Sequence, residues 1–162
     1  MKNMQKIYAE CIDDLKVYGI SLPQYTPKLI VNTRAKKRWG QARGGVNPQI
    51  SINSRLLADD VDDFGARNCM MHEILHLCAP GDNHGGEWKA LANKVNRKSG
   101  GKYKIKRTST AEEYGVPEQS SKYLVECNKC GYQIGRERMS KLIEHPWRFT
   151  HNGCGGDFRR VR

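Results

Sequence analysis

A chain of 162 residues with a net charge of +11 and 38% hydrophobic residues is long enough for one domain and a small appended module. Its apolar runs fall short of the ~18 residues that a membrane-spanning helix needs, so we expect no membrane partner. The stretch MKNMQKIYAECIDD has no apolar core with a cleavage site, which predicts a cytoplasmic protein. In that reducing environment cysteines serve more often as metal ligands than as disulfides.

The excess of basic residues favours a polyanionic partner, with nucleic acid as the first candidate. A well-solvated cationic surface has the same composition, so charge alone leaves both interpretations open.

The first part of the chain predicts a helix followed by short strands. Hydrophobic residues recur at helical spacing from Met4 to Tyr18, and Gly19 follows as a C-terminal cap. Alternating or β-branched segments then predict three strands, at residues 28–33, 37–43 and 48–53.

Two further helices are expected before the chain changes character. The acidic residues Asp59, Asp60, Asp62 and Asp63 precede a helix that we expect to run to about Ala79, because carboxylates favour the positive end of a helix dipole. An apolar stripe beginning at Trp88 predicts the next helix, which ends near Ser99.

The expected organisation is therefore an α+β domain with a cysteine-bearing module behind it. The boundaries are a domain at 1–107, a polar linker at 108–121 and a small module at 122–162.

The segment MMHEILHLCAPGDNHGGEW, residues 70–88, carries the first candidate site. Residues four apart on a helix project from the same face, so His72 and His76 can reach one ion. Glu73 lies beside them, where it can accept a proton from water, and HExxH on a helix is typical of a catalytic zinc with a general base. The neighbouring residues are nearly all apolar, so these polar groups cost desolvation unless a metal pairs with them.

A catalytic zinc of this kind takes three protein ligands, and the third has several candidates. His84 follows the Pro-Gly break that ends the helix, where the chain can fold back toward it. Asp82 and Glu87 are the alternatives, and we favour His84 over both.

HEILH followed by His84-Gly-Gly-Glu-Trp resembles the SprT-like zinc metallopeptidases, which pair HExxH with a downstream His-Gly-x-x-aromatic segment. The resemblance covers most of the chain. It implies a zincin-like fold, in which a small mixed sheet lies beside the HExxH helix and an edge strand aligns a peptide. It also implies His84 as third ligand and hydrolysis of proteins, in several members proteins bound or crosslinked to DNA.

A second candidate site lies in the C-terminal module, in ECNKCGYQ and HNGCGGD. Two ligand pairs, each spaced by two residues, can close a tetrahedral structural zinc site of Cys127, Cys130, His151 and Cys154. The glycines after Cys130 and Cys154 permit the tight turns. SprT-like proteins often carry a zinc ribbon here, usually with four cysteines, so His151 is a departure, and His145 is a competing fourth ligand.

Basic and aromatic residues surround the predicted ribbon, a combination that suits phosphate contacts and base stacking. The candidate nucleic-acid residues are Arg136, Arg138, Lys141, Trp147 and Arg148. The alternative is that Trp147 and Phe149 only pack the small module.

The sequence therefore predicts a zinc-dependent endopeptidase with two zinc ions, one catalytic and one structural. We expect it to act on DNA-associated or DNA-crosslinked proteins. The expected DNA partner is single-stranded or damaged DNA. The expected location is with the nucleoid or other DNA of the cell. In this hypothesis Glu73 acts as base and then as acid, and the strand Gln49–Asn53 pairs with the substrate. The alternatives are a non-enzymatic zinc protein that binds nucleic acid and a peptidase that acts on free proteins.

Overall fold

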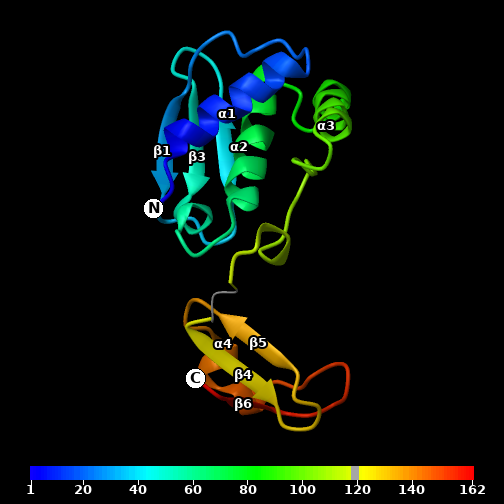
Figure 1. The fold of residues 1–162 in the computed structure, drawn as a ribbon. Helices are drawn as coiled ribbons and strands as arrows, with labels where there is room; N and C mark the ends of the chain where they lie inside the picture. The colour runs from blue at the N-terminus through cyan, green and yellow to red at the C-terminus, as the bar shows by residue number, and fades with distance from the viewer. Residues whose placement is uncertain (118–120) are drawn as a thin grey trace. The chain divides into compact units, whose positions relative to one another are not determined.

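The computed structural model describes residues 1–117 and 121–162 and divides the chain into two compact units, Met1–Pro117 and Glu118–Arg162 (Figure 1). Both units contain helices and a small sheet, so the expected mixed α+β class is confirmed at that level. None of the helices in the described part of the chain has the length and apolar character that crossing a lipid bilayer requires.

The first helix, α1, spans Met4–Val17, close to its predicted range. Asn3 caps its N-terminus, because the Asn3 side chain accepts a hydrogen bond from the Lys6 N–H at 3.0 Å. The chain leaves the helix through Gly19 at φ 64°, a left-handed conformation that glycine adopts without steric cost. The buried face of α1 consists of Met4, Ile7, Cys11 and Leu15.

The sheet of the first unit contains three strands, β1 (Lys28–Asn32), β2 (Gly40–Arg43) and β3 (Gln49–Asn53), in the order β1-β3-β2. β3 pairs parallel to β1 and antiparallel to β2. The three strands lie within the predicted segments, and β2 begins three residues later than predicted.

The position of β3 corrects the prediction that it pairs with a substrate. Both edges of β3 are already used, one by each neighbouring strand, so its backbone groups are not free to bind another chain. β2 pairs with β3 alone and forms an edge of the described sheet.

The helix α2 spans Asp63–Cys78 and contacts α1, α3, β2 and β3. Asp62 caps its N-terminus by accepting from the Phe64 N–H at 2.6 Å, which is the role expected for the acidic residues there. Because α2 is enclosed by the sheet and by two helices, apolar residues occupy most of its circumference, and Met70, Met71, Ile74 and Leu75 are all buried.

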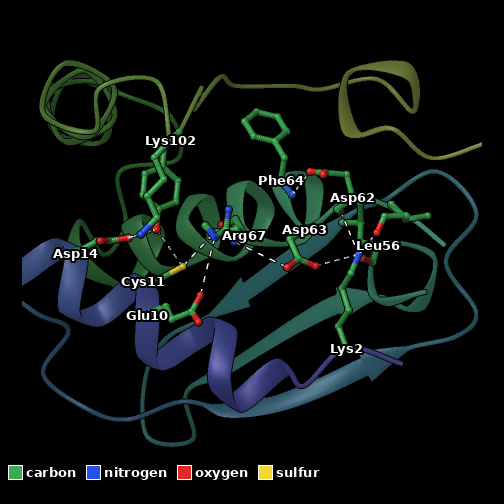
Figure 2. A network of polar contacts seen from close by, with 12 residues as sticks. Lys2, Glu10, Cys11, Asp14, Leu56, Asp62, Asp63, Phe64, Arg67 and Lys102 are labelled. Atoms are coloured by element: carbon green, nitrogen blue, oxygen red, sulfur yellow. Dashed lines mark hydrogen bonds and ion pairs between the residues drawn. The ribbon is translucent and has the colours of Figure 1, made fainter. Parts of the chain in front are cut away.

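Polar contacts join α1 to α2 at the surface of the first unit (Figure 2). The Arg67 guanidinium lies 3.9 Å from a Glu10 carboxylate oxygen and 4.0 Å from one of Asp63. Partly exposed ion pairs of this kind contribute little, about 0–1 kcal/mol each. The shared core of α1, α2 and the sheet therefore provides most of the stability of this unit.

The helix α3 spans Gly86–Lys98, and the chain then crosses the unit without forming a strand. The predicted linker at 108–121 is in part packed onto the first unit, because Tyr114 and Val116, around the short helix η2 (Glu112–Tyr114), belong to its core. Residues 118–120 of that predicted linker lie outside the described residues.

The second unit contains a three-stranded antiparallel sheet in the order β5-β4-β6, where β4 is Tyr123–Cys127, β5 is Gln133–Arg136 and β6 is Phe158–Arg160. The helix α4 (Lys141–Glu144) and the turn η3 (Pro146–Arg148) lie between β5 and β6 in the chain. Among the described residues of this unit, the buried hydrophobic cluster consists of Val125, Cys127, Ile143 and Phe158. A core of this size is too small to stabilise a fold by apolar burial alone, which favours a metal crosslink.

Candidate metal centres

Three imidazoles converge in the first unit. The Nε2 atom of His72 lies 3.3 Å from that of His76 and 3.0 Å from that of His84, and His76 and His84 are 3.1 Å apart. A tetrahedral zinc with Zn–N bonds of ~2.0–2.1 Å separates its nitrogen ligands by ~3.3–3.4 Å. The cluster therefore fits a divalent ion bound by three histidines, with one position left for water or substrate.

Local structure explains how each imidazole reaches the cluster. His72 and His76 lie one turn apart on α2 and project from the same face. His84 comes from the loop between α2 and α3, and it has φ 59°, the only positive φ among non-glycine residues in the described ranges. That conformation costs about 1–2 kcal/mol for a residue with a Cβ atom, so the cluster holds His84 in a strained backbone.

Burial favours the neutral form of the imidazoles, which is the form that binds metal. Burial and the neighbouring His76 and His84 rings lower the pKa of His72 to about 4. Burial and the His84 imidazole lower the pKa of His76, and burial and the charge of Arg107 lower the pKa of His84. The Nδ1 atom of His72 lies 3.0 Å from the backbone carbonyl of Lys106, so the neutral ring donates there and leaves Nε2 free for the cluster.

The other two candidates for third ligand have different positions. Asp82 accepts a hydrogen bond from the Trp88 N–H at 2.7 Å and thereby caps α3. Glu87 is exposed on the first turn of α3 and does not belong to the cluster. Trp88 packs against all three imidazoles, with ring centroids 4.8 Å from His72, 5.4 Å from His76 and 4.6 Å from His84. Of the three candidates, only His84 is brought to the cluster.

Glu73 is buried between α2 and the edge strand β2, with 6% of its surface exposed. Burial raises the pKa of the Glu73 carboxyl to about 7, although the Ala42 backbone N–H and the charge of Arg38 act in the opposite direction. A carboxyl group with a pKa near neutrality can both accept and return a proton. The backbone contact to β2 also fixes the carboxylate on the cleft side of α2.

Gly40 makes that close approach of β2 to α2 possible. A Cβ atom at Gly40 would lie 2.5 Å from Glu73 Oε1 and 2.7 Å from Cys69 Sγ, closer than real Cβ contacts. The sequence contained a signal for this role, since a glycine inside a strand often marks a close backbone approach.

We expect Gly40→Ala to destabilise the first unit by about 1–3 kcal/mol, the usual cost of overpacking, and to displace the Glu73 carboxylate. Denaturant unfolding measures the first effect, and the rate of peptide hydrolysis measures the second. Gly44→Ala is the matched control, because a Cβ there meets only Leu77 Cδ2, at 3.9 Å. Equal stability of the two variants would contradict this account of Gly40.

A cleft of about 750 Å³ opens over the three histidines and Glu73. One wall is the edge strand β2 with the preceding residues 37–39, and the opposite walls are the loop 79–84 and the segment 106–109. The basic residues Lys37, Arg38, Lys106 and Arg107 also line it. Its volume lies within the ~300–1,000 Å³ range of ligand-binding clefts, and both the imidazoles and the carboxylate line it.

Four potential ligands converge in the second unit, Cys127, Cys130, His151 and Cys154, with all ligand atoms within 4.8 Å of one another. Cys127 Sγ lies 3.4 Å from Cys154 Sγ, and Cys130 Sγ lies 3.2 Å from His151 Nδ1. The chemistry of this donor set suits zinc with no open position. The competing residue His145 is not part of this group, although it lies in the same unit.

The glycines of the second centre adopt the predicted turn conformations. Gly131 has φ 73° and Gly155 has φ 70°, and each directly follows a cysteine of the cluster. Gly156 allows a further close approach, because a Cβ there would lie 2.7 Å from Cys127 Sγ. Replacing Gly156 by a larger residue would therefore disturb the cluster.

The five candidate nucleic-acid residues, Arg136, Arg138, Lys141, Trp147 and Arg148, are all exposed on the second unit. Trp147 has 63% of its surface exposed and Phe149 has 38%, so neither is buried in the module core. The basic and aromatic side chains are available to a ligand in solution.

Comparison with known proteins assigns no family, because no family model matches the chain and no curated protein matches its sequence. The functional argument therefore rests on the geometry of the two clusters. Sequence reasoning missed two contributions to the first of them, the Ala42 N–H and the Lys106 carbonyl. Backbone groups from distant segments leave no motif, so no signal in the sequence pointed to either.

Proposed function

We propose that the chain is a zinc-dependent endopeptidase of the SprT-like type, with a zincin-like first unit and a zinc ribbon as its second unit. The observation that carries the proposal is the convergence of three imidazole nitrogens beside the buried carboxylate of Glu73, in a cleft bordered by the edge strand β2. A purely structural zinc site would need neither the carboxylate nor the cleft, which argues against a non-enzymatic protein.

In this proposal His72, His76 and His84 hold the ion. A zinc ion bound there supplies a Lewis acid that polarises a carbonyl and lowers the pKa of water to about 7. Glu73 accepts a proton from the attacking water and then donates it to the amine that leaves. The hydrogen bond from the Ala42 N–H orients the Glu73 carboxylate throughout.

The strand β2 is the natural docking edge for the substrate. An extended peptide added to the free edge of β2 would run along the wall of the cleft that contains Gly40, Gln41 and Ala42. Main-chain hydrogen bonds would hold such a peptide with little dependence on its side chains. This mode predicts cleavage within unstructured segments, because a folded segment cannot present an extended backbone.

The direct test is incubation of an unfolded protein with the zinc-loaded chain, followed by mass spectrometry of the fragments. Internal cleavage that stops on chelation and returns with zinc would support an endopeptidase. Two bound zinc ions without any cleavage, but with nucleic-acid binding, would favour the non-enzymatic alternative.

We also propose that the second unit brings the peptidase to DNA, since basic and aromatic side chains are exposed there. Binding through phosphates predicts an affinity that falls steeply with salt, with a slope of roughly −0.7 to −0.9 per phosphate neutralised. Tethering raises the effective concentration of a DNA-bound substrate, so its cleavage should exceed that of the same protein free.

Trp147→Ala combined with Arg148→Gln should weaken DNA binding and remove the stimulation while leaving cleavage of a free peptide unchanged. Fluorescence anisotropy across a salt series measures the first effect, and paired cleavage assays measure the second. Salt-independent binding, or equal cleavage with and without DNA, would leave a peptidase that acts on free proteins.

A further inference from the structure

The segment 102–109, which we call the strap, is bound to α2 and α3 by side-chain amides. The Lys104 N–H donates to Asn68 Oδ1 at 2.8 Å, and Asn68 Nδ2 donates to the Lys104 carbonyl at 3.2 Å. From α3, Asn96 makes the same pair of contacts to the next residue, Ile105, at 2.6 and 2.9 Å. Each asparagine side chain therefore bonds both the backbone N–H and the carbonyl of one strap residue, as a neighbouring β-strand would.

The strap and α2 have matching spacings. Asn68 and His72 lie one turn apart on α2, which corresponds to a rise of ~6 Å. Lys104 and Lys106 lie two residues apart in a segment that is neither helix nor strand, and two residues of chain can span up to ~6.6–7.2 Å. Asn68 bonded to Lys104 therefore brings the Lys106 carbonyl level with His72, whose Nδ1 atom lies 3.0 Å from it.

Further contacts fix both ends of the strap. The Tyr103 hydroxyl donates to Asp14 of α1 at 2.5 Å. Lys102 forms an ion pair with the same carboxylate (Figure 2). At the other end, Trp39 Nε1 donates to the Ser109 carbonyl at 2.9 Å. The Lys106 carbonyl lies between these anchors; Asn68 holds the strap to α2 two residues before it, and Asn96 holds the intervening residue to α3.

Asn68 itself has 1% of its surface exposed. An asparagine inside a helix has low helix propensity, and a buried amide is costly unless both of its polar groups are bonded. Here the oxygen and the nitrogen of the Asn68 amide are both paired with Lys104, so burial of the amide is compensated by the strap.

We propose that Asn68 is a positioning residue for the first metal centre. By holding the strap, Asn68 fixes the Lys106 carbonyl, which selects the Nδ1–H tautomer of His72 and directs Nε2 toward His76 and His84. This inference rests on the proposed function only in that the three-histidine cluster binds zinc. Partners that orient a ligand in this way typically change metal affinity by about 10–100-fold.

The test is Asn68→Ala in the full chain, compared with Ser99→Ala. Ser99 Oγ accepts from the Tyr103 N–H at 3.2 Å, so its loss loosens the strap upstream of residues 104–106. Co²⁺ titration separates the two centres, because only the thiolate-bound ion gives sulfur charge-transfer absorption. We expect Asn68→Ala to weaken Co²⁺ binding at the three-histidine centre by at least about 10-fold. Ser99→Ala should keep the wild-type affinity at that centre. The affinity of the ribbon centre should be unchanged in both variants.

Equal Co²⁺ affinity of wild type and Asn68→Ala at the three-histidine centre would overturn the inference and leave the proposed function intact. Equal weakening by Ser99→Ala would overturn it too, because the effect would then be a general loosening of the strap. A wild-type protein that binds Co²⁺ only at the ribbon would instead refute the proposed function.

A measurement on the wild-type protein tests the proposal even where Asn68→Ala fails to fold. Long-range ¹H–¹⁵N NMR of the metal-free wild type should identify His72 as the neutral Nδ1–H tautomer. The Nε2–H tautomer would contradict the proposal.

Discussion

Glu73→Gln should lower the rate of peptide hydrolysis by at least about 10²-fold, within the ~10²–10⁴-fold range of general-base contributions. Glutamine has the shape of glutamate, so it can still accept the Ala42 N–H and fill the space beside Gly40. It cannot take a proton from water, and the reaction loses its base. The zinc content should not change, because Glu73 is not among the three converging ligands.

The measurement is the turnover of a fluorogenic peptide, together with zinc analysis of the same samples. Glu87→Gln is the matched control, since Glu87 is an exposed carboxylate on α3 outside the cluster. A Glu73→Gln protein with undiminished turnover would exclude the proposed mechanism. A variant that loses its zinc would show instead that Glu73 supports the metal.

Cys127→Ser combined with Cys130→Ser should remove one of two zinc ions and unfold the second unit. In the described part of that unit four residues form the buried hydrophobic core, so a structural zinc, which in small domains binds with about 10–16 kcal/mol, would provide most of its stability. The first unit has its own core and should keep its fold and its zinc.

Zinc analysis and NMR of the double variant test this expectation, with loss of signal dispersion confined to residues 121–162. Cys78→Ser is the control, because Cys78 lies on α2 and belongs to neither cluster. A folded second unit in the double variant would contradict a structural role for the metal.

The local elements were predictable from the sequence because their signals are local. Helical periodicity and the glycine after it located α1 within one residue of its ends, and alternating residues located β3. The end of β2 was predicted correctly, but its start was predicted three residues too early. Residues 37–39 were assigned to the strand, and in the structure they line the cleft before the strand begins. Burial of Tyr114 and Val116 was missed, because the polar residues around them resemble a linker.

The sequence by itself determined which side chains can form the two clusters. Ligands four positions apart on a helix, and ligands three positions apart in a turn, are brought together by local backbone geometry. Only the tertiary structure decided that β2 is an edge strand and β3 is central, and that His84 approaches the cluster while Asp82 accepts from the Trp88 N–H of α3. It also decided that the Lys106 carbonyl reaches His72. These contacts join segments far apart in the chain, and their geometry follows from packing, which leaves no periodic trace in the sequence.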